Sequence, residues 1–329
     1  GILGQLKAAG CTTILVTGGE PLLHPACLSI LRRAKQEGLL VSLYTNGSLV
    51  DEETAAELGE LNLVDIAITL YGADAATHDR YTRCPGSFGR VTEAVRRLNE
   101  AGCNLRLRWY ALPASVEQTG AFIDLAESLG VRWQASGVIT ARRDGTCSRR
   151  VSDAQLFGFY RTVVERFYSA EGLLARAKQM AEALDRSTGP ETRMCGAGLA
   201  GGRIDPAGVL YTCMDISDPV GDLRRVPFAD AWKRTADISE GLRLNHFPDC
   251  EACRYFWACN TCPGAFRAET GSWGETPREQ CRNTHLRLLA ISRCADELLG
   301  DRRNPLAGRL DDSPFLETAH GFQNTAAHA

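Results

Sequence analysis

Long apolar runs, an excess of one charge and internal repeats are all missing from this sequence of 329 residues. No apolar stretch approaches the roughly 18 residues that a membrane-spanning helix requires, and no export signal is visible at the N-terminus. The 37 basic and 40 acidic residues leave a net charge of −3, which indicates no surface for nucleic acid or for an anionic membrane. We therefore expect a cytoplasmic globular protein with no nucleic-acid or membrane partner.

Cysteine, by contrast, is abundant, with 13 residues. Five of them are scattered before residue 150, seven crowd into residues 195–281, and Cys294 follows alone. A disulfide scaffold would be short and secreted, whereas this chain is long and shows no export signal. Thiols gathered so densely are therefore expected to be metal ligands. The seven are Cys195, Cys213, Cys250, Cys253, Cys259, Cys262 and Cys281.

The first 140 residues alternate between strand and helix patterns. This alternation predicts an α/β fold with a parallel sheet and right-handed crossovers, either open or as a parallel barrel that lacks its first unit. The expected strands cover residues 12–17, 39–47, 64–72, 104–112 and 131–139, and the expected helices cover residues 26–38, 51–61, 87–102 and 117–130.

The pattern changes after residue 139. A basic connector is followed by two expected helices, at residues 153–168 and 171–186, and then by a cysteine-rich region of loops. Within that region "DPAG" predicts a hairpin turn. A last helix is expected over residues 283–299, with Cys294 on its apolar side. The polar tail from residue 301 is expected to be poorly ordered.

Four of the cysteines follow a compressed pattern, Cys250-x2-Cys253-x5-Cys259-x2-Cys262. Two Cys-x2-Cys pairs often bind zinc, but a zinc ribbon separates its pairs by roughly 15 to 20 residues. Five intervening residues are too few for that geometry. The short spacing, with further cysteines at a distance, favours cubane iron–sulfur clusters.

The whole set of seven resembles the SPASM domain of radical S-adenosylmethionine (radical SAM) enzymes, whose pattern includes Gly-x4-Cys, here Gly208 to Cys213. The resemblance implies two auxiliary iron–sulfur clusters of the [4Fe-4S] type. Residues 185–194 lack the additional cysteine that some relatives have, so the fourth ligand of the second cluster is left open. One cluster would be held by Cys250, Cys253, Cys259 and Cys281, and the other by Cys195, Cys213 and Cys262.

A second resemblance lies near the N-terminus, in "TGGEP". Two adjacent glycines at a strand end let a ligand approach the main chain, and an acid is a natural partner for an ammonium group. The motif resembles the one that holds the methionine amino group of S-adenosylmethionine (SAM) in radical SAM enzymes. The resemblance implies a SAM site formed by Gly18, Gly19, Glu20, Pro21, Thr45, Asn46 and Thr69. A turn that merely uses glycine and proline remains the alternative for this motif.

The sequence also departs from the family. A Cys-x3-Cys-x2-Cys loop, which would bind the cluster that cleaves SAM, does not occur. We expect Cys11 and Cys27 to be packing residues and not substitutes for it. Because residue 1 is not Met, we expect an N-terminal truncation; a degenerate family member is the alternative. A third [4Fe-4S] cluster, and SAM cleavage with it, are expected only with the missing triplet.

The resemblance implies a partial (β/α)6-type radical SAM barrel over residues 1–140, a helical bridge over 141–190, a SPASM domain over 191–300 and a tail over 301–329. It also implies an enzyme that uses a 5′-deoxyadenosyl radical to abstract hydrogen, with a peptide or protein substrate and a low-potential electron donor. A non-catalytic iron–sulfur scaffold and a zinc-binding structural protein remain alternatives.

Three polar residues receive no catalytic role from the sequence. His78 and Asp79 are expected to serve in capping or loop packing. In some relatives an Asp directly after the Gly-x4-Cys motif acts as a base. Here Met214 holds that place and Asp215 follows it, so the role is not transferred and the catalytic residues remain unassigned.

Overall fold

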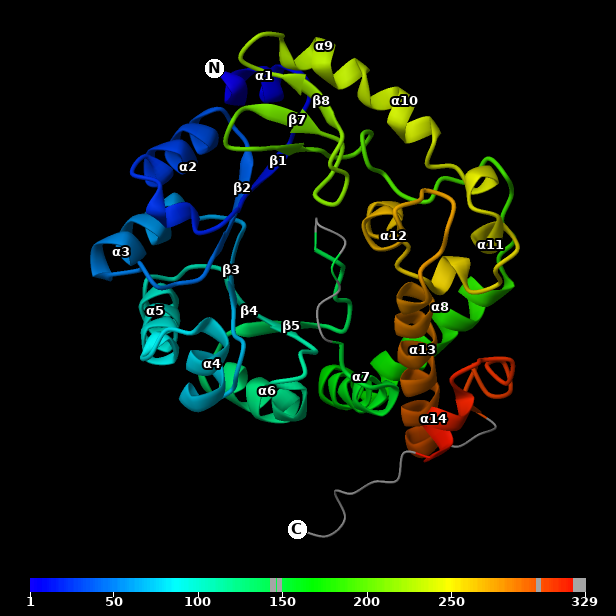
Figure 1. Ribbon diagram of the computed structural model, residues 1–329. Coiled ribbons are helices and arrows are strands. Elements are labelled where there is room, and N and C mark those ends of the chain that lie inside the picture. The colour runs from blue at the N-terminus through cyan, green and yellow to red at the C-terminus, as the bar shows by residue number, and fades with distance from the viewer. Residues whose placement is uncertain (143–145, 147–149, 300–302, 322–329) are drawn as a thin grey trace. The chain divides into compact units, whose positions relative to one another are not determined.

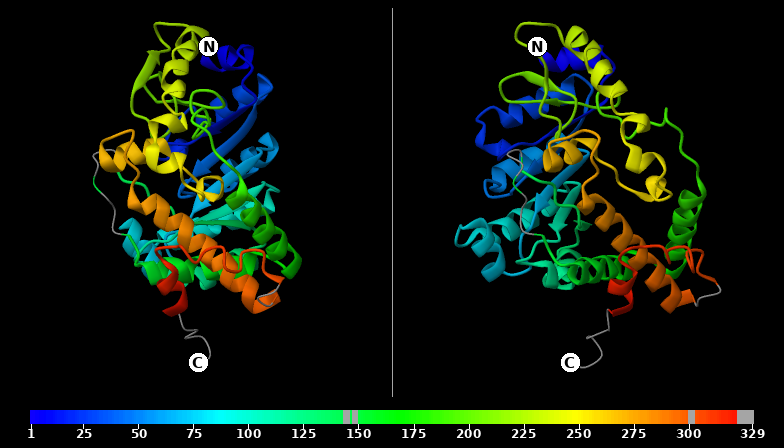
Figure 2. Two further views of the ribbon diagram at one scale, coloured as in Figure 1. Left: turned by 90° about the vertical axis from the view of Figure 1, so that its right-hand side faces the viewer. Right: turned by 45° about the vertical axis from the view of Figure 1, so that its right-hand side comes forward.

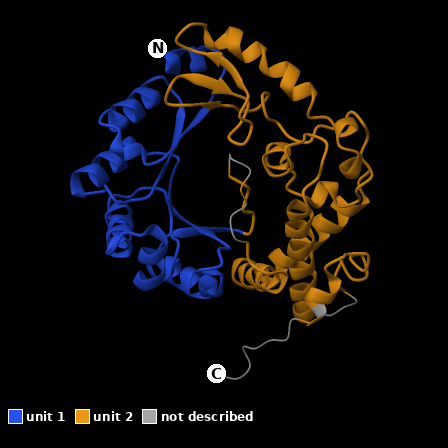
Figure 3. Cartoon of the chain, viewed as in Figure 1, with its two compact units in different colours: residues 1–136 blue, residues 137–329 orange. Residues whose placement is uncertain are grey.

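The structure, a computed structural model, describes residues 1–142, 146, 150–299 and 303–321 (Figure 1). It divides into two compact units, Gly1–Ser136 and Gly137–Ala329 (Figure 3). Cys147, one of the scattered cysteines, lies outside the described residues. Among the described helices, none is long and apolar enough to cross a membrane.

The first unit contains one five-stranded sheet in which every neighbouring pair is parallel, in the order β1-β2-β3-β4-β5. Helices alternate with the strands, so the predicted parallel α/β architecture is confirmed. The elements are α1 (Ile2–Ala8), β1 (Thr13–Val16), η1 (Pro21–Leu23), α2 (Cys27–Gln36), β2 (Leu40–Thr45), α3 (Glu52–Leu61), β3 (Asp65–Thr69), α4 (Ala75–Thr82), α5 (Ser87–Glu100), β4 (Leu105–Tyr110), η2 (Val116–Gln118), α6 (Thr119–Ser128) and β5 (Arg132–Ser136).

The two faces of this sheet differ in polarity. Helices α2 to α6 lie along one face (Figure 1). Strand β4 turns Leu105, Leu107 and Trp109 toward that face, where they are buried, while the alternating positions are only half-buried. Helix α5 matches this surface because its apolar residues recur every three or four positions. The sheet therefore has a covered apolar face and a polar face on its other side.

Helix α4 was not predicted, and it contains both His78 and Asp79. Asp79 Oδ1 accepts hydrogen bonds from the Phe88 N–H at 2.8 Å and the Ser87 hydroxyl at 2.9 Å, and its Oδ2 accepts from the Gly86 N–H at 2.6 Å. It thus pairs the free N–H groups at the start of α5, which confirms the expected capping role. His78 is buried and its Nδ1 accepts from the backbone of Tyr71.

The second unit is mainly helical, with a small antiparallel sheet in the order β6-β7-β8. The predicted hairpin turn is confirmed, since Asp205 accepts hydrogen bonds from the N–H groups of Ala207 and Val209 between β6 and β7. Helix α13 packs against α7 and α8, and the views in Figure 2 agree. The elements are α7 (Asp153–Phe167), α8 (Ala170–Asp185), β6 (Arg203–Ile204), β7 (Val209–Tyr211), β8 (Pro219–Asp222), α9 (Phe228–Lys233), α10 (Thr235–Glu240), η3 (Leu244–His246), α11 (Pro248–Glu251), η4 (Phe256–Ala258), α12 (Pro263–Thr270), α13 (Arg278–Leu299) and α14 (Leu316–Gly321).

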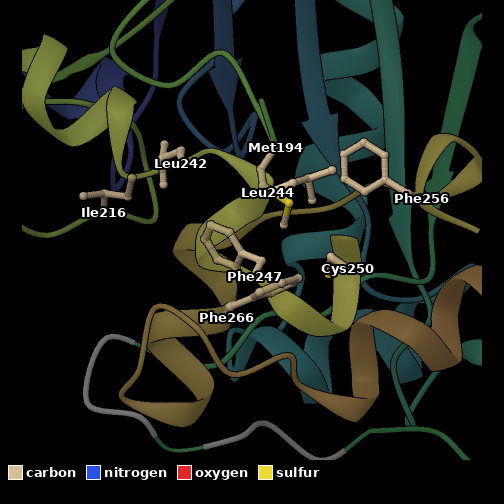
Figure 4. Close-up of a cluster of buried hydrophobic side chains, with 8 residues drawn as sticks. All are labelled: Met194, Ile216, Leu242, Leu244, Phe247, Cys250, Phe256 and Phe266. Carbon is tan, nitrogen blue, oxygen red and sulfur yellow. The ribbon is translucent and has the colours of Figure 1, made fainter. Parts of the chain in front are cut away.

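The cysteine-rich region has an apolar cluster of its own (Figure 4). Phe247 and Phe266 meet edge to face, with ring centroids 6.1 Å apart, and Cys250 is buried in the same cluster. Cys294 is buried in α13, as expected. The tail that we expected to be poorly ordered is described at residues 303–321, where it forms α14.

Candidate functional site

The loop after β1 presents bare main chain. Gly18 has φ +150°, a conformation that side-chain-bearing residues rarely adopt. Gly19 does not have a positive φ, and a Cβ placed on it would meet no atom within 4 Å. The fold therefore requires glycine at Gly18 but leaves the space at Gly19 empty. Open space over a main chain that needs no glycine for its own geometry fits the approach of a ligand.

Glu20 joins the carboxyl ends of the first two strands. Its Oε1 accepts hydrogen bonds from the Leu22 N–H at 3.0 Å and from the Thr45 hydroxyl at 2.7 Å. Its Oε2 accepts from the Asn46 N–H at 2.6 Å. A carboxylate has about four positions at which it can accept a hydrogen bond. These three donors therefore leave about one acceptor position free for an ammonium group. The structure thus brings Glu20, Thr45 and Asn46 together, as the predicted site requires.

The other predicted residues of this site are less closely tied. Pro21 is the first residue of η1, where its fixed φ suits a helical turn. Thr69 ends β3 and lies opposite Arg108 in the register of β3 and β4. Both share the carboxyl edge of the sheet with Glu20, but no hydrogen bond given by the structure links Thr69 to Glu20 or Thr45.

The polar face of the sheet carries several charged side chains that the sequence did not identify as functional. Arg106 forms an ion pair with Asp65 at 2.5 Å, and Arg132 reaches the same carboxylate at 3.2 Å. Arg108 stacks on Tyr44, with its Cζ 4.6 Å from the ring centroid. These side chains alternate along their strands with buried apolar ones, and that alternation was the available signal.

This face is basic and hollowed. No carboxylate of the described residues lies within ion-pair distance of Arg108, and the buried Nε of Arg106 has no hydrogen-bond partner among them. A hollow of about 460 Å³ opens on the face, toward the amino ends of the strands, and none of its lining belongs to the predicted SAM site. Its lining is Leu15, Ser42, Tyr44, Val64, Asp65, Asn104, Arg106 and Arg132.

In the second unit, four of the seven predicted ligand thiols form one group. Burial raises the pKa of the Cys281 thiol to about 11, and the nearby thiols of Cys259, Cys253 and Cys250 raise it further. Burial also raises the pKa of Cys259, against the lowering effect of the Thr284 hydroxyl, which donates to its sulfur at 3.0 Å. Cys281 and Thr284 both belong to α13, so this helix contributes one thiol and one hydrogen-bond donor to the group.

The remaining three thiols form a second group. Burial raises the pKa of the Cys262 thiol to about 12, and the Asp215 carboxylate and Cys213 raise it further, against the lowering effect of the Ala265 N–H. Burial raises the pKa of Cys213 as well, and Cys195 is among its neighbours. The chain brings these residues together from three places: the loop before β6, the turn after β7 and the start of α12.

The spacing of these thiols bears on the kind of metal site. Among the described residues, no three His, Cys, Asp or Glu side chains converge closely enough to hold a single metal ion. A cubane cluster binds one ligand on each of four irons. Sulfur ligands in groups of four and three are a donor set that suits two such clusters.

Comparison with known proteins gives a family match for the first part of the chain. The model of the radical SAM superfamily matches residues 2–126, which contain the sheet and the loop of Gly18, Gly19 and Glu20. An AdoMet-dependent heme synthase of Methanosarcina barkeri is 26% identical over 295 residues, covering 83% of this chain and 83% of its own length. AdoMet is S-adenosylmethionine.

Two further comparisons concern a maturase and a solved structure with a bound peptide. The mycofactocin maturase MftC of Mycobacterium tuberculosis is 26% identical over 297 residues, covering 86% of this chain and 74% of its own length. A solved structure, native anSMEcpe with bound AdoMet and Kp18Cys peptide, has a TM-score of 0.63 and 13% identity and covers 90% of both chains. At that identity the likeness shows the fold. The matched model therefore identifies residues 2–126 as a domain of the radical SAM superfamily, and the two relatives are similar to the chain over more than four fifths of its length.

Proposed function

We propose that this protein is a radical SAM enzyme of the SPASM type, with a SAM site at the carboxyl ends of β1 to β3 and two auxiliary [4Fe-4S] clusters. The observation that carries the proposal is the division of seven thiols into two groups, one of four and one of three. In this proposal residues 1–140 form the catalytic domain, 141–190 a bridge and 191–300 the cluster domain.

Reductive cleavage of SAM to a 5′-deoxyadenosyl radical, which abstracts hydrogen from the substrate, would be supplied by SAM together with a third cluster, whose Cys-x3-Cys-x2-Cys ligands do not occur in this sequence. The chain's own residues bind and orient. Main chain at Gly18 and Gly19 is open to the methionine end of SAM, and Glu20 offers its remaining acceptor position to the ammonium group. Thr45 and the Asn46 N–H hold the carboxylate of Glu20 in place for that contact.

We propose a peptide or protein as the substrate. The maturase relative and the peptide-bound structure support this substrate class, and the basic face of β4 supplies groups that suit its carboxylates. Arg106 and Arg108 bring two guanidinium groups to a face where Asp65 is the carboxylate in contact. A low-potential electron donor completes the set of proposed partners.

Metal analysis tests the cluster assignment. After anaerobic reconstitution we expect about eight iron atoms per chain. Cys253→Ala and Cys213→Ala should each remove about four, because each variant breaks a different group. Cys84→Ser is the matched control, since Cys84 is exposed in the other unit and belongs to neither group. Stoichiometric zinc, or equal loss in all three variants, would contradict the proposal.

Selection from a displayed peptide library tests the substrate class. Binders enriched on the reconstituted protein should share acidic positions and should lose affinity for the Arg106→Gln/Arg108→Gln variant. The heme synthase relative suggests an iron porphyrin as the rival substrate class. An absorbance titration with an iron porphyrin that saturates at one equivalent, with no peptide enriched, would reject a peptide substrate in favour of this class.

A further inference from the structure

The three-thiol group has a carboxylate in contact with it. Asp215 lies two residues after Cys213, and its Oδ2 accepts a hydrogen bond from the Cys262 thiol at 3.5 Å. This is the contact that the structure gives for the Asp215 carboxylate, and no cationic side chain of the described residues pairs with it. Its neighbour Asp218, by comparison, is ion-paired with Arg267.

Close packing fixes this carboxylate beside the thiols. A Cβ placed on Gly264 would lie 2.7 Å from the Cβ of Asp215 and 3.1 Å from its carbonyl carbon. Only glycine at this position of α12 therefore lets the helix lie against the turn that carries Asp215. The turn is held in addition by the Ile216 N–H, which donates to the Cys213 sulfur at 3.3 Å.

The three-thiol group is one ligand short of the four that a cubane cluster can bind. A cubane cluster has four irons, and this group offers three thiols. Residues 185–194, where some relatives have an additional cysteine, contain none. A carboxylate oxygen is an accepted iron ligand, and binding to iron would replace the hydrogen bond between Cys262 and Asp215, because both ligands are then deprotonated.

We propose that Asp215 is the fourth protein ligand of the cluster held by Cys195, Cys213 and Cys262. This inference rests on the proposed function, because it assumes that the three thiols bind a cluster. In this arrangement three irons of the cluster would each bind a thiolate and the fourth would bind a carboxylate oxygen. The fourth iron would therefore be chemically distinct from the other three.

The test uses the full chain in a Cys253→Ala background, so that the three-thiol cluster is observed alone. Asp215→Ala, Asp215→Cys and the control Met214→Leu are reconstituted anaerobically and compared by iron content and by Mössbauer and electron paramagnetic resonance spectra. Met214 is the adjacent residue, 54% exposed, and carries a sulfur that could also reach a metal. Thermal unfolding checks that each variant is folded.

We expect Asp215→Ala to lose the distinct iron, so that iron falls from about four to about three per chain and a three-iron signal appears. Asp215→Cys should restore about four irons with a changed spectrum, because a thiolate replaces the oxygen. Met214→Leu should match the parent. An Asp215→Ala protein with parental iron and spectra overturns the inference, and so does a Met214→Leu protein that loses the same iron. If Cys213→Ala also keeps its iron, it is the proposed cluster site itself that fails.

Discussion

The hydroxyl of Thr45 donates a hydrogen bond of 2.7 Å to Oε1 of Glu20, across the carboxyl ends of β2 and β1. Thr45 is buried, and its Oγ1 also accepts from the Gly47 N–H at 3.1 Å. The hydroxyl is thus held from both sides, and it orients the Glu20 carboxylate, whose other oxygen accepts from the N–H of Asn46, the residue directly after Thr45. The pair is a preorganised acceptor for a cationic group.

Glu20→Gln should weaken SAM binding by roughly 1–2 kcal/mol, which is about a 5- to 30-fold rise in Kd. The amide keeps one acceptor oxygen but loses the negative charge, and its NH2 group faces a donor. Isothermal titration with SAM measures the change. Glu60→Gln, at an exposed position of α3, is the control and should bind as the parent does. Equal affinity in parent and Glu20→Gln would refute the role of the charge.

Gly19→Val should abolish SAM binding while leaving thermal stability nearly unchanged. The valine side chain would fill space that the fold leaves empty, since no atom lies within 4 Å of the new Cβ. Circular dichroism melting beside a SAM titration separates the two effects.

Gly72→Ala provides the opposite case in the same unit. A Cβ at this position would lie 2.4 Å from the backbone nitrogen of His78. We therefore expect the variant to be destabilised by about 2 kcal/mol. A Gly19→Val protein that unfolds as Gly72→Ala does would show that Gly19 serves the turn and not a ligand.

Asp79 should make the first unit sensitive to acid. The N–H of Phe88 has the largest effect and lowers the pKa of the Asp79 carboxyl; desolvation raises this pKa, but the N–H of Gly86 and the hydroxyl of Ser87 lower it further, so that the net shift is downward. Because the folded-state pKa lies below the unfolded one, the stabilisation is fully present above the unfolded pKa of about 4 and is lost as pH falls through the folded value.

The measurement is the difference in melting temperature between the parent and Asp79→Asn from pH 7 to pH 3, on metal-free protein. We expect a constant advantage of the parent down to about pH 5 that narrows below it. Asp51→Asn serves as a comparison, since Asp51 caps α3 in the same way and its pKa is also lowered. A difference that does not change with pH would mean that the charge of Asp79 is irrelevant.

The sequence predicted the sheet well because each strand alternates with an amphipathic helix, and because that pattern is local. Helix α4 was missed since its eight residues carry no apolar stripe and it ends at Arg83 in the left-handed conformation. The short elements between β8 and α12 were missed for the same reason. Their order comes from contacts distant in sequence, such as Phe247 against Phe266.

The residues of the candidate SAM site could be named from the sequence, but the contacts between them could not. The motif pointed to Glu20 and to Thr45, yet the hydrogen bond between them follows from the register of β1 and β2 and is not encoded in either segment alone. The contact of Asp215 with Cys262 likewise joins residues 47 positions apart. Spacing can identify ligand types, whereas the place of Asp215, the proposed fourth ligand, depends on the packing of α12 at Gly264.

Arg282 should be a main support of the second unit. Its side chain is only 9% exposed and pairs with Asp153 of α7 and, at 3.0 Å, with Glu279 of α13, while its Nη2 donates to the carbonyl of Val151. Arg282→Met should cost about 3 kcal/mol in urea unfolding, because it leaves Glu279, which is 12% exposed, without this partner. Iron content should persist in the folded fraction, since the neighbouring Cys281 is unchanged.

Arg293→Met is the matched control on the same helix. Arg293 pairs with Glu297 at 3.1 Å, but its side chain is 48% exposed, so the solvent already screens the pair. We expect a loss below about 1 kcal/mol. The comparison is decisive because both variants replace one ion-paired arginine of α13 with methionine. If the two proteins unfold at the same urea concentration, burial of Arg282 between α7 and α13 does not stabilise the unit, and the attachment of the helix that carries Cys281 must depend on its other contacts, such as the hydrogen bond between Tyr160 and Asn283.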